Sequence, residues 1–512
     1  MKIRLGISES IQHWARYTPD KQCILSENLA FSYRQLDCAI EWFANLISSR
    51  YGTGACVPVI IEDKPLLFAI IVACIRCGNY PSIINPNLSL KEFKHVLAEL
   101  SENKIVVESK CNALLTESYD CYKVSQETLL LYQDYKQRSH WKTPNLEDPW
   151  GILYSSGTTG IPKGIIRSHF SILTELLGWL IELETRKSSH YYIGRPVFYT
   201  GGLVITLTAI LVGGTVSMPN AHDENMYLSH CKKYKIDLSF LIPSQIQALV
   251  RYVEQEDIKH PPNARFILSM GAAFPSDLKA HAMEVLHSGI IESWGNTEGL
   301  GTITLPDDVK TRPDSIGRPF LTDDLFIIGE QGQKVNQKEV GRLSGIVDSK
   351  FTDYKNSEFL TTQHFSDDTI ISEDLGYENE DGYFYLLGRV GDMFIYKGHK
   401  IYPISLEKVI ASLDAVEEVS VVGIKVGDEG YIPVAFIKSS KIEASDHKTL
   451  DFINSKLEES ERIRFIKIID QFPKTASGKI KKEELRLMYT DEIIAAFRQK
   501  YRNIPVESGQ VE

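Results

Sequence analysis

A loop rich in hydroxyl groups and glycine has the residue types that a polyphosphate requires. The segment 154–164 reads YSSGTTGIPKG and contains serine and threonine hydroxyls, three glycines and one lysine, Lys163. Glycines let successive backbone N–H groups turn toward an anion, and the hydroxyls and the ammonium group add donors and positive charge. A nucleotide P-loop has Ser or Thr directly after Gly-Lys. Here Gly164 and Ile165 follow Lys163, so that motif does not fit.

The elements around this loop indicate that it is more than a surface linker. Residues 150–154 have the pattern of a short buried strand, and 165–183 carry apolar residues at helical spacing, so we expect a helix there. Strand and helix patterns alternate along most of the chain. This alternation predicts an α/β fold, a large layered N-terminal domain over residues 1–388.

A change of pattern near Gly388 predicts a second, smaller domain. Residues 324–387 are rich in strands and turns, whereas a compact βαβ-like pattern follows. We expect a small mobile C-terminal α/β domain over 389–490. Residues 491–512 are charged and lack apolar periodicity, so we expect a loose tail.

Composition excludes several classes of partner. The net charge of −11 argues against nucleic acid or an anionic membrane as the main partner. The N-terminus has no signal-peptide pattern, and no apolar run is long enough to span a bilayer. The eight cysteines form no disulfide framework, so we expect a cytoplasmic protein with reduced thiols. Cys74 and Cys77 form a CxxC motif. We interpret them as two thiols that face the core from an apolar helix, rather than as a zinc or redox site.

The loop 154–164 closely resembles the phosphate loop of the acyl-adenylate-forming superfamily, which comprises acyl-CoA synthetases, peptide-synthetase adenylation domains and luciferases. Further segments resemble the family's motifs in the family's order, and together they cover the chain from Phe31 to Lys479: 31–36, 80–86, 269–273, 292–298, 372–376, 388–403 and 473–480. The resemblance implies an enzyme that binds ATP and Mg²⁺.

The resemblance also implies a role for individual residues. Glu298 would bind Mg²⁺, a hard ion that takes carboxylates and phosphate oxygens. Lys479 would bridge the substrate carboxylate and the α-phosphate, where a cation offsets the repulsion between two anions. The catalytic residues would be Lys479, Thr297 and Glu298. The cofactor-binding residues would be Ser155, Ser156, Gly157, Thr158, Thr159, Gly160, Lys163, Gly271, Ala272, Trp294, Asp374 and Arg389, of which Asp374 and Arg389 would contact the ribose.

The substrate pocket should include Tyr199, Thr200 and Gly271. Tyr199 aligns with the residue that gates the carboxylate site in the family. Relatives that act on α-amino acids carry an aspartate beside this gate, where the present chain has Thr200. Without that charge partner a buried ammonium group would be costly. A plain or aryl carboxylic acid is therefore favoured over an amino acid.

The resemblance implies a ligase that forms acyl-AMP and pyrophosphate and then transfers the acyl group to a thiol. Coenzyme A is the favoured acceptor, and the phosphopantetheine arm of a separate carrier protein is the alternative. A non-catalytic nucleotide-binding relative would have lost Lys163, Glu298 or Lys479, all of which are present. The chain departs from the family pattern at Glu373, Gly391 and Ile395, of which Gly391 stands at the expected hinge between the domains.

Overall fold

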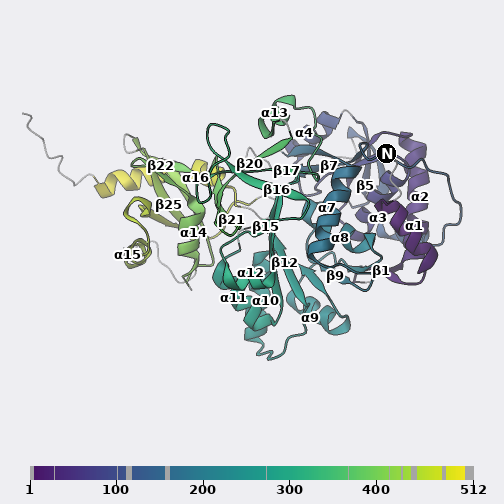
Figure 1. Ribbon diagram of the computed structural model, residues 1–512, viewed down its shortest axis with the longest axis horizontal. Coiled ribbons are helices and arrows are strands. Elements are labelled where there is room, and N and C mark those ends of the chain that lie inside the picture. The colour runs from purple at the N-terminus through teal and green to yellow at the C-terminus, as the bar shows by residue number, and fades with distance from the viewer. Residues whose placement is uncertain are drawn as a thin grey trace, which may run out of the picture. The chain divides into compact units, whose positions relative to one another are not determined.

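The structure is a computed structural model (Figure 1) that forms two compact units. Unit 1 comprises Met1–Phe326, Ser344–Ser372 and Glu378–Tyr385, and unit 2 comprises Ile327–Leu343, Glu373–Tyr377 and Leu386–Glu512. The residues described are 5–27, 29–100, 102–110, 118–155, 162–272, 274–366, 368–413, 415–427, 430–439, 447–474 and 480–501. The predicted boundary at residue 388 and the hinge at Gly391 stay predictions.

A nine-stranded sheet in unit 1 has its six middle strands, β13 through β1, parallel to one another. Parallel strands joined by crossovers carry their connecting loops at one carboxyl edge, where ligands commonly bind. In spatial order the strands are β15 (Arg318–Pro319), β14 (Gly301–Thr304), β13 (Gly289–Gly295), β12 (Phe266–Met270), β11 (Leu238–Phe240), β9 (His190–Ile193), β10 (Thr215–Ser217), β1 (Gln22–Leu25) and β2 (Ala30–Ser32).

A second sheet of unit 1 carries the hydroxyl-rich loop. Its strands β7 and β8 form an antiparallel hairpin in which Ser155 pairs with Lys163, so residues 156–162 connect the two strands. The order is β18 (Asp353–Tyr354), β8 (Lys163–Ser168), β7 (Pro149–Ser155), β4 (Tyr80–Ile83), β3 (Cys56–Ile60), β5 (Lys104–Glu108) and β6 (Asp120–Val124). A third sheet has the order β16 (Asp323–Ile328), β17 (Gly341–Val347), β20 (Thr369–Glu378) and β19 (Phe365–Ser366), and β21 (Phe384–Arg389) pairs with β20.

The helix predicted from residue 165 begins later than expected. Residues Lys163–Ser168 pair with β7 as strand β8, and helix α7 starts at His169. Ser168 ends the strand and caps the helix, since its hydroxyl accepts a hydrogen bond from the backbone N–H of Ser171 at 3.1 Å. Pairing with β7 therefore outweighed the helical spacing of the apolar residues in this stretch.

Helices of unit 1 pack between and around the two large sheets. The largest buried cluster takes side chains from both sheets and from α1 (Ile7–Tyr17), α2 (Tyr33–Tyr51), α3 (Lys64–Arg76), α7 (His169–Glu182) and α8 (Thr200–Leu211). All of α3 is buried, as expected for a helix that is apolar on every side. The other helices of unit 1 are α4 (Leu90–Leu100), α6 (Gln126–Leu131), α9 (Glu224–Lys233), α10 (Pro243–Gln255), α11 (Ser276–Leu286), α12 (Pro306–Thr311) and α13 (Glu358–His364).

The CxxC thiols lie in this core. Cys74 is fully buried on α3 and Cys77 is 2% exposed at the end of the helix. Burial raises the pKa of both thiols, that of Cys77 to about 11, so both are protonated at neutral pH. Across the part of the chain that the structure describes, no group of His, Cys, Asp and Glu side chains has the arrangement of a metal site.

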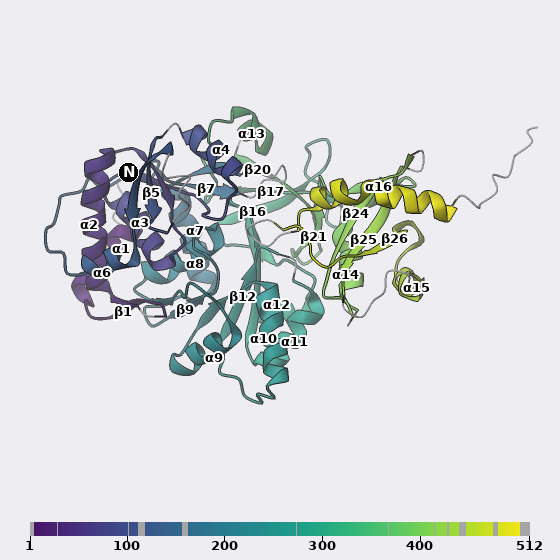
Figure 2. The same cartoon turned by 180° about the vertical axis from the view of Figure 1, so that it is seen from behind.

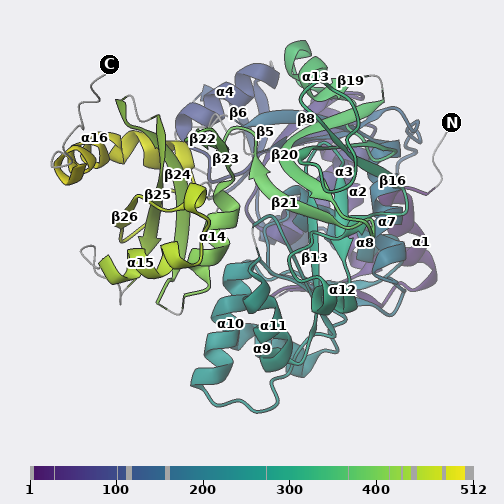
Figure 3. The same cartoon turned by 60° about the vertical axis from the view of Figure 1, so that its left-hand side comes forward.

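Unit 2 is built on the three-stranded sheet β24 (Glu418–Lys425), β25 (Tyr431–Lys438) and β26 (Phe465–Ile468) (Figure 2). Helices α14 (Pro403–Ala411) and α16 (Lys482–Tyr501) pack on β24 (Figure 3). The unit also contains the hairpin β22 (Phe394–Tyr396) and β23 (His399–Ile401), helix α15 (His447–Ser455) and the short 3₁₀ helix Glu459–Glu461. We expected a loose tail from residue 491, but helix α16 continues to Tyr501 and Ile493 on this helix is fully buried. The expectation is therefore wrong for residues 491–501. Within the described residues, no helix is long and apolar enough to cross a membrane.

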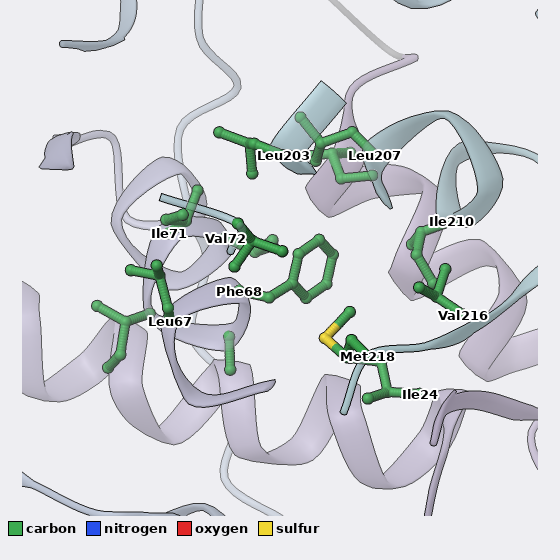
Figure 4. Packing of buried hydrophobic residues seen from close by; sticks show 14 of the residues in the cluster. Ile24, Leu67, Phe68, Ile71, Val72, Leu203, Leu207, Ile210, Val216 and Met218 are labelled. Carbon is green, nitrogen blue, oxygen red and sulfur yellow. The ribbon is translucent and has the colours of Figure 1, made fainter. Parts of the chain in front are cut away.

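Phe68 of α3 gives a direct test of the unit 1 core. Its ring is fully buried and lies among α3, α8 and β10 side chains (Figure 4). We expect Phe68→Ala to lower the free energy of unfolding by about 3–5 kcal/mol. The substitution would leave a cavity in the core, and the surrounding side chains could fill it only in part. Urea denaturation measures the change. Phe359→Ala, the same change at a ring that is 75% exposed, should cost less than about 0.5 kcal/mol. Equal effects would contradict this account.

Candidate functional site

The carboxyl ends of the parallel strands bring separate stretches of the sequence to one edge of the nine-stranded sheet. Just past the strands, the N–H of Gly194 donates to the carbonyl of Phe240, and the N–H of Leu241 donates to that of Leu268, both at 3.0 Å. A Cβ on Gly201, in the first turn of α8, would lie 2.7 Å from the sulfur of Met270. The predicted site segments after β9, β12 and β13 therefore share this edge.

A tight turn after β13 presents Thr297 and Glu298. The side-chain oxygen of Asn296 accepts hydrogen bonds from the N–H groups of Gly299 at 3.1 Å and Leu300 at 2.9 Å. Gly299 has φ +124°, and a Cβ there would overlap the carbonyl of Ser349. Only glycine fits this position. The turn leaves the side chains of Thr297 and Glu298 half-buried.

The guanidinium group of Arg167 joins this turn to the loop-bearing hairpin. Arg167 lies on β8 and is fully buried. It donates to the carbonyl of Thr297 at 3.2 Å and to the carbonyl of Ser349 at 2.7 Å. It also donates to the hydroxyl of Ser171 at 3.1 Å and forms an ion pair with Glu175 at 2.8 Å. The buried charge is thus paired and hydrogen-bonded, as burial requires.

A second support reaches Glu298 from residues 349–354. The hydroxyl of Ser349 donates to the carbonyl of Gly299 at 2.9 Å, and the N–H of Phe351 donates to the carbonyl of Glu298 at 2.8 Å. The phenol of Tyr354 donates to Oε1 of Glu298 at 2.5 Å. Glu298, which is predicted to bind Mg²⁺, is therefore held by hydrogen bonds to both its backbone carbonyl and its side-chain carboxylate.

The backbone just past strand β12 is open at Gly271. Gly271 has φ +89°, and a Cβ there would meet no described atom within 4 Å. Ala272 is exposed. Met270 pairs with Ser293, so Gly271 and the half-buried Trp294 are the next residues along two neighbouring strands. Small residues beside an aromatic side chain allow close approach of a flat ring, and the adenine role of these positions stays a prediction.

The predicted gate, Tyr199, stands beside polar and basic groups. Its hydroxyl accepts a hydrogen bond from the side-chain amide of Asn85 at 3.3 Å, and the guanidinium carbon of Arg195 lies 5.4 Å from its ring centroid. Burial raises the pKa of Tyr199 to about 12, so the phenol is neutral. Among the described residues, no hydrogen bond or ion pair joins a carboxylate to Tyr199 or Thr200. These surroundings suit a carboxylate better than an ammonium group.

In unit 2 the two residues predicted to contact the ribose lie together. The guanidinium Nε of Arg389 is 3.3 Å from a carboxylate oxygen of Asp374. Asp374 is mostly buried and Arg389 is partly exposed. An ion pair of this kind orients the carboxylate, and a carboxylate is an acceptor of the kind that the two hydroxyls of a diol require.

Other predicted site residues lie outside the described part of the chain. These are Ser156, Gly157, Thr158, Thr159, Gly160 and Lys479. Ser155 and Lys163 are described and face each other at the start of the connection. The sequence reasoning missed Arg167 and Tyr354. A basic residue in the otherwise apolar run 165–167 was a usable signal for Arg167, whereas nothing local marks Tyr354.

Comparison with known proteins gives the chain a family. A family model described as "AMP-binding enzyme" matches residues 11–344, and one described as "AMP-binding enzyme C-terminal domain" matches residues 405–479. A 2-succinylbenzoate–CoA ligase of Listeria innocua is 25% identical over 93% of this chain and 98% of its own length. A feruloyl-CoA synthase of Amycolatopsis is 24% identical over 92% and 96%.

Solved structures share the fold. O-succinylbenzoate CoA synthetase of Bacillus subtilis, in complex with ATP and magnesium ion, has a TM-score of 0.85 at 21% identity and covers 93% of this chain and 99% of that one. An anthranilate CoA ligase in complex with anthranoyl-AMP has a TM-score of 0.84 at 20% identity, with coverages of 95% and 98%. The predicted α/β fold, with a large N-terminal and a small C-terminal part, is confirmed.

A carboxyl group near Arg167 makes stability depend on pH. Asp323, at the start of β16, is largely buried, and its Oδ1 accepts a hydrogen bond from the hydroxyl of Thr322 at 2.9 Å. Burial raises the pKa of Asp323 to about 7, with further contributions from the charges of Glu175 and Asp348. The folded chain therefore binds this proton more tightly than the unfolded chain.

We expect Asp323→Asn to raise the thermal unfolding midpoint near pH 8, to raise it less near pH 5 and to have little effect below about pH 4. A raised carboxyl pKa gives stability that is complete below the unfolded pKa, about 4, and is lost as pH rises through about 7. Asparagine keeps the hydrogen-bond acceptor and removes the charge. Melting curves over this pH range test the prediction, and a shift of equal size at every pH would contradict it.

Proposed function

The chain belongs to the AMP-binding enzyme family, the acyl-adenylate-forming superfamily that its motifs resemble, and on that premise we propose that it is an ATP-dependent acid–thiol ligase. It would activate a carboxylic acid as acyl-AMP and then pass the acyl group to a thiol. One observation carries the proposal. The Thr297–Glu298 turn is tied by Arg167 to the hairpin that carries the hydroxyl-rich loop.

The residues of unit 1 fit Mg²⁺-bound ATP. The Glu298 carboxylate offers oxygen ligands to a hard cation, and Gly271, Ala272 and Trp294 border space for the adenine. When bound, the ion neutralises charge on the phosphate oxygens. The loop 155–163 would bind the β- and γ-phosphates, Thr297 the α-phosphate, and Asp374 and Arg389 the ribose.

In the first step a carboxylate oxygen of the acid attacks the α-phosphorus. The new O–P bond replaces the bond to the β-phosphate, and pyrophosphate leaves with the electron pair. Lys479 would lie between the two anions and stabilise the charge that develops. In the second step a thiolate attacks the acyl carbon, and AMP leaves. No covalent enzyme intermediate is needed, so the residues act by positioning and by charge.

The proposed substrate is an aryl or plain carboxylic acid. Tyr199, Asn85 and Arg195 supply hydrogen bonding and positive charge where an amino-acid ligase would need a carboxylate. The curated relatives named above are ligases of 2-succinylbenzoate and ferulate, both aromatic acids. Coenzyme A is the proposed acceptor, because those relatives form CoA esters by name, and a carrier-protein phosphopantetheine is the second acceptor to test. A cytoplasmic location stays a prediction.

ATP–pyrophosphate exchange over a panel of aryl, fatty and amino acids tests the proposal. We expect exchange with one class of acid, and we expect Glu298→Ala and Lys479→Ala each to lower it by roughly 100-fold or more, since each removes charge stabilisation in the transition state. Lys456→Ala, at an exposed lysine of unit 2, serves as the control and should leave the rate unchanged. Coenzyme A or a carrier protein is then added to identify the acceptor.

Three outcomes would contradict parts of this proposal. Exchange with amino acids alone would overturn the role assigned to Tyr199 and Thr200. Full exchange in Glu298→Ala would remove that residue from the metal site. Bound ATP without exchange across a broad panel would favour a non-catalytic nucleotide-binding protein.

A further inference from the structure

We propose that Tyr354 is a positioning residue for the Glu298 carboxylate, and that its hydroxyl holds one carboxylate oxygen so that the other is presented to the cation of a metal–nucleotide complex. The inference rests on the metal-binding role proposed for Glu298. It adds a residue that lies 56 positions from Glu298 in the sequence and that belongs to none of the segments whose motifs identified the family.

The contact is short and its two partners differ in burial. The Tyr354 hydroxyl donates to Oε1 of Glu298 at 2.5 Å. Tyr354 is 1% exposed, whereas Glu298 is half-buried. Among the described residues, Oε2 of Glu298 takes part in no hydrogen bond or ion pair. A hydrogen bond to a carboxylate is about twice as strong as one between neutral groups, so the phenol fixes both the rotamer of Glu298 and the oxygen left for a ligand.

Tyr354 itself has little freedom. Its backbone pairs with Ile165 of β8, the strand that begins at Lys163, and its N–H donates to the hydroxyl of Thr361 at 3.1 Å. The ring packs edge-on against Phe351, with centroids 5.0 Å apart, and lies 5.7 Å from the ring of His364. The hydroxyl is therefore delivered from a strand and held by packing, which is how partners of metal-binding side chains are usually fixed.

The hydrogen bond also couples two parts of the site. Strand β8 starts at the hydroxyl-rich loop, and β18 lies beside it, so Tyr354 sets the distance between that hairpin and the Glu298 carboxylate. Arg167 performs the same task for the backbone of the turn. The Tyr354 contact acts on the side chain alone, and removing its oxygen leaves the backbone contacts in place.

The metal-linked gain in nucleotide affinity tests this role without turnover. Calorimetry gives the Kd of ATP with Mg²⁺ and with a chelator in the absence of an acid, and the ratio of the two values measures the gain. We expect Tyr354→Phe to reduce the gain roughly tenfold and to leave the Kd with chelator unchanged, because partners of metal ligands typically change metal affinity by 10–100-fold. Glu298→Gln should abolish most of the gain.

Two further variants separate positioning from general structure. Tyr227→Phe removes a buried hydroxyl that donates to Ser239 at 3.1 Å, and it should leave the gain unchanged. Adding Tyr354→Phe to Glu298→Gln should have no further effect if Tyr354 acts through that carboxylate. The inference would be overturned if Tyr354→Phe kept the wild-type gain in ATP affinity, or if it lost affinity equally with and without Mg²⁺. It would also be overturned if the effects of Tyr354→Phe and Glu298→Gln added up in the double variant.

Failure of this inference can be told apart from failure of the proposed function. If Tyr354→Phe keeps the Mg²⁺-dependent gain in ATP affinity while the wild-type protein shows ATP–pyrophosphate exchange, the positioning role of Tyr354 is rejected and the ligase activity is kept. If the variants change the Mg²⁺-dependent gain as expected but the protein shows no exchange with any acid, the positioning role is kept and the proposed ligase activity is rejected.

Discussion

The buried guanidinium of Arg167 is the interaction on which the candidate site depends. Removing a guanidinium from water is costly, and the charge is tolerated because donors on three sides of it meet Glu175, Ser171 and the carbonyls of Thr297 and Ser349. Those partners come from the helix after β8, the turn after β13 and the segment before β18. One side chain therefore joins β8 and α7 to two elements that lie more than 100 residues further along the chain.

This constraint holds a tight turn beside the hairpin that carries the hydroxyl-rich loop. Catalysis of phosphoryl and acyl transfer by charge requires that donors and carboxylates stand in place before the substrate binds. Gly299 closes the turn against Ser349, Asn296 caps it from within, and Tyr354 fixes the carboxylate at its end. This hydrogen-bonded turn carries the residues predicted to contact the metal and the α-phosphate.

The sequence predicted the motifs and the fold class but not the contacts between distant elements. Trp294, Thr297 and Glu298 were predicted because the short segment 292–298 resembles a family motif, and a motif of this length can be recognised within one stretch of sequence. The start of α7 was misplaced because helical spacing in residues 165–168 competes with strand pairing on β7, which no single stretch reveals. Tyr354 was missed because the pairing of β18 with β8 is what brings it to Glu298, and this pairing cannot be read from the sequence around Tyr354. A single tyrosine in a polar segment has no recognisable pattern.

The departure at Glu373 also acquires a physical reading. A glutamate beside Asp374 would be expected to repel it, yet Asp374 still pairs with Arg389 at 3.3 Å. The backbone carbonyl of Glu373 accepts from the N–H of Val390 at 2.9 Å, which sets the two strands in register. Burial lowers the pKa of the nearby Arg342, and the charge of Glu373 opposes that shift. Attraction between Glu373 and Arg342 thus partly offsets the added negative charge, and Asp374 keeps its ion pair with Arg389.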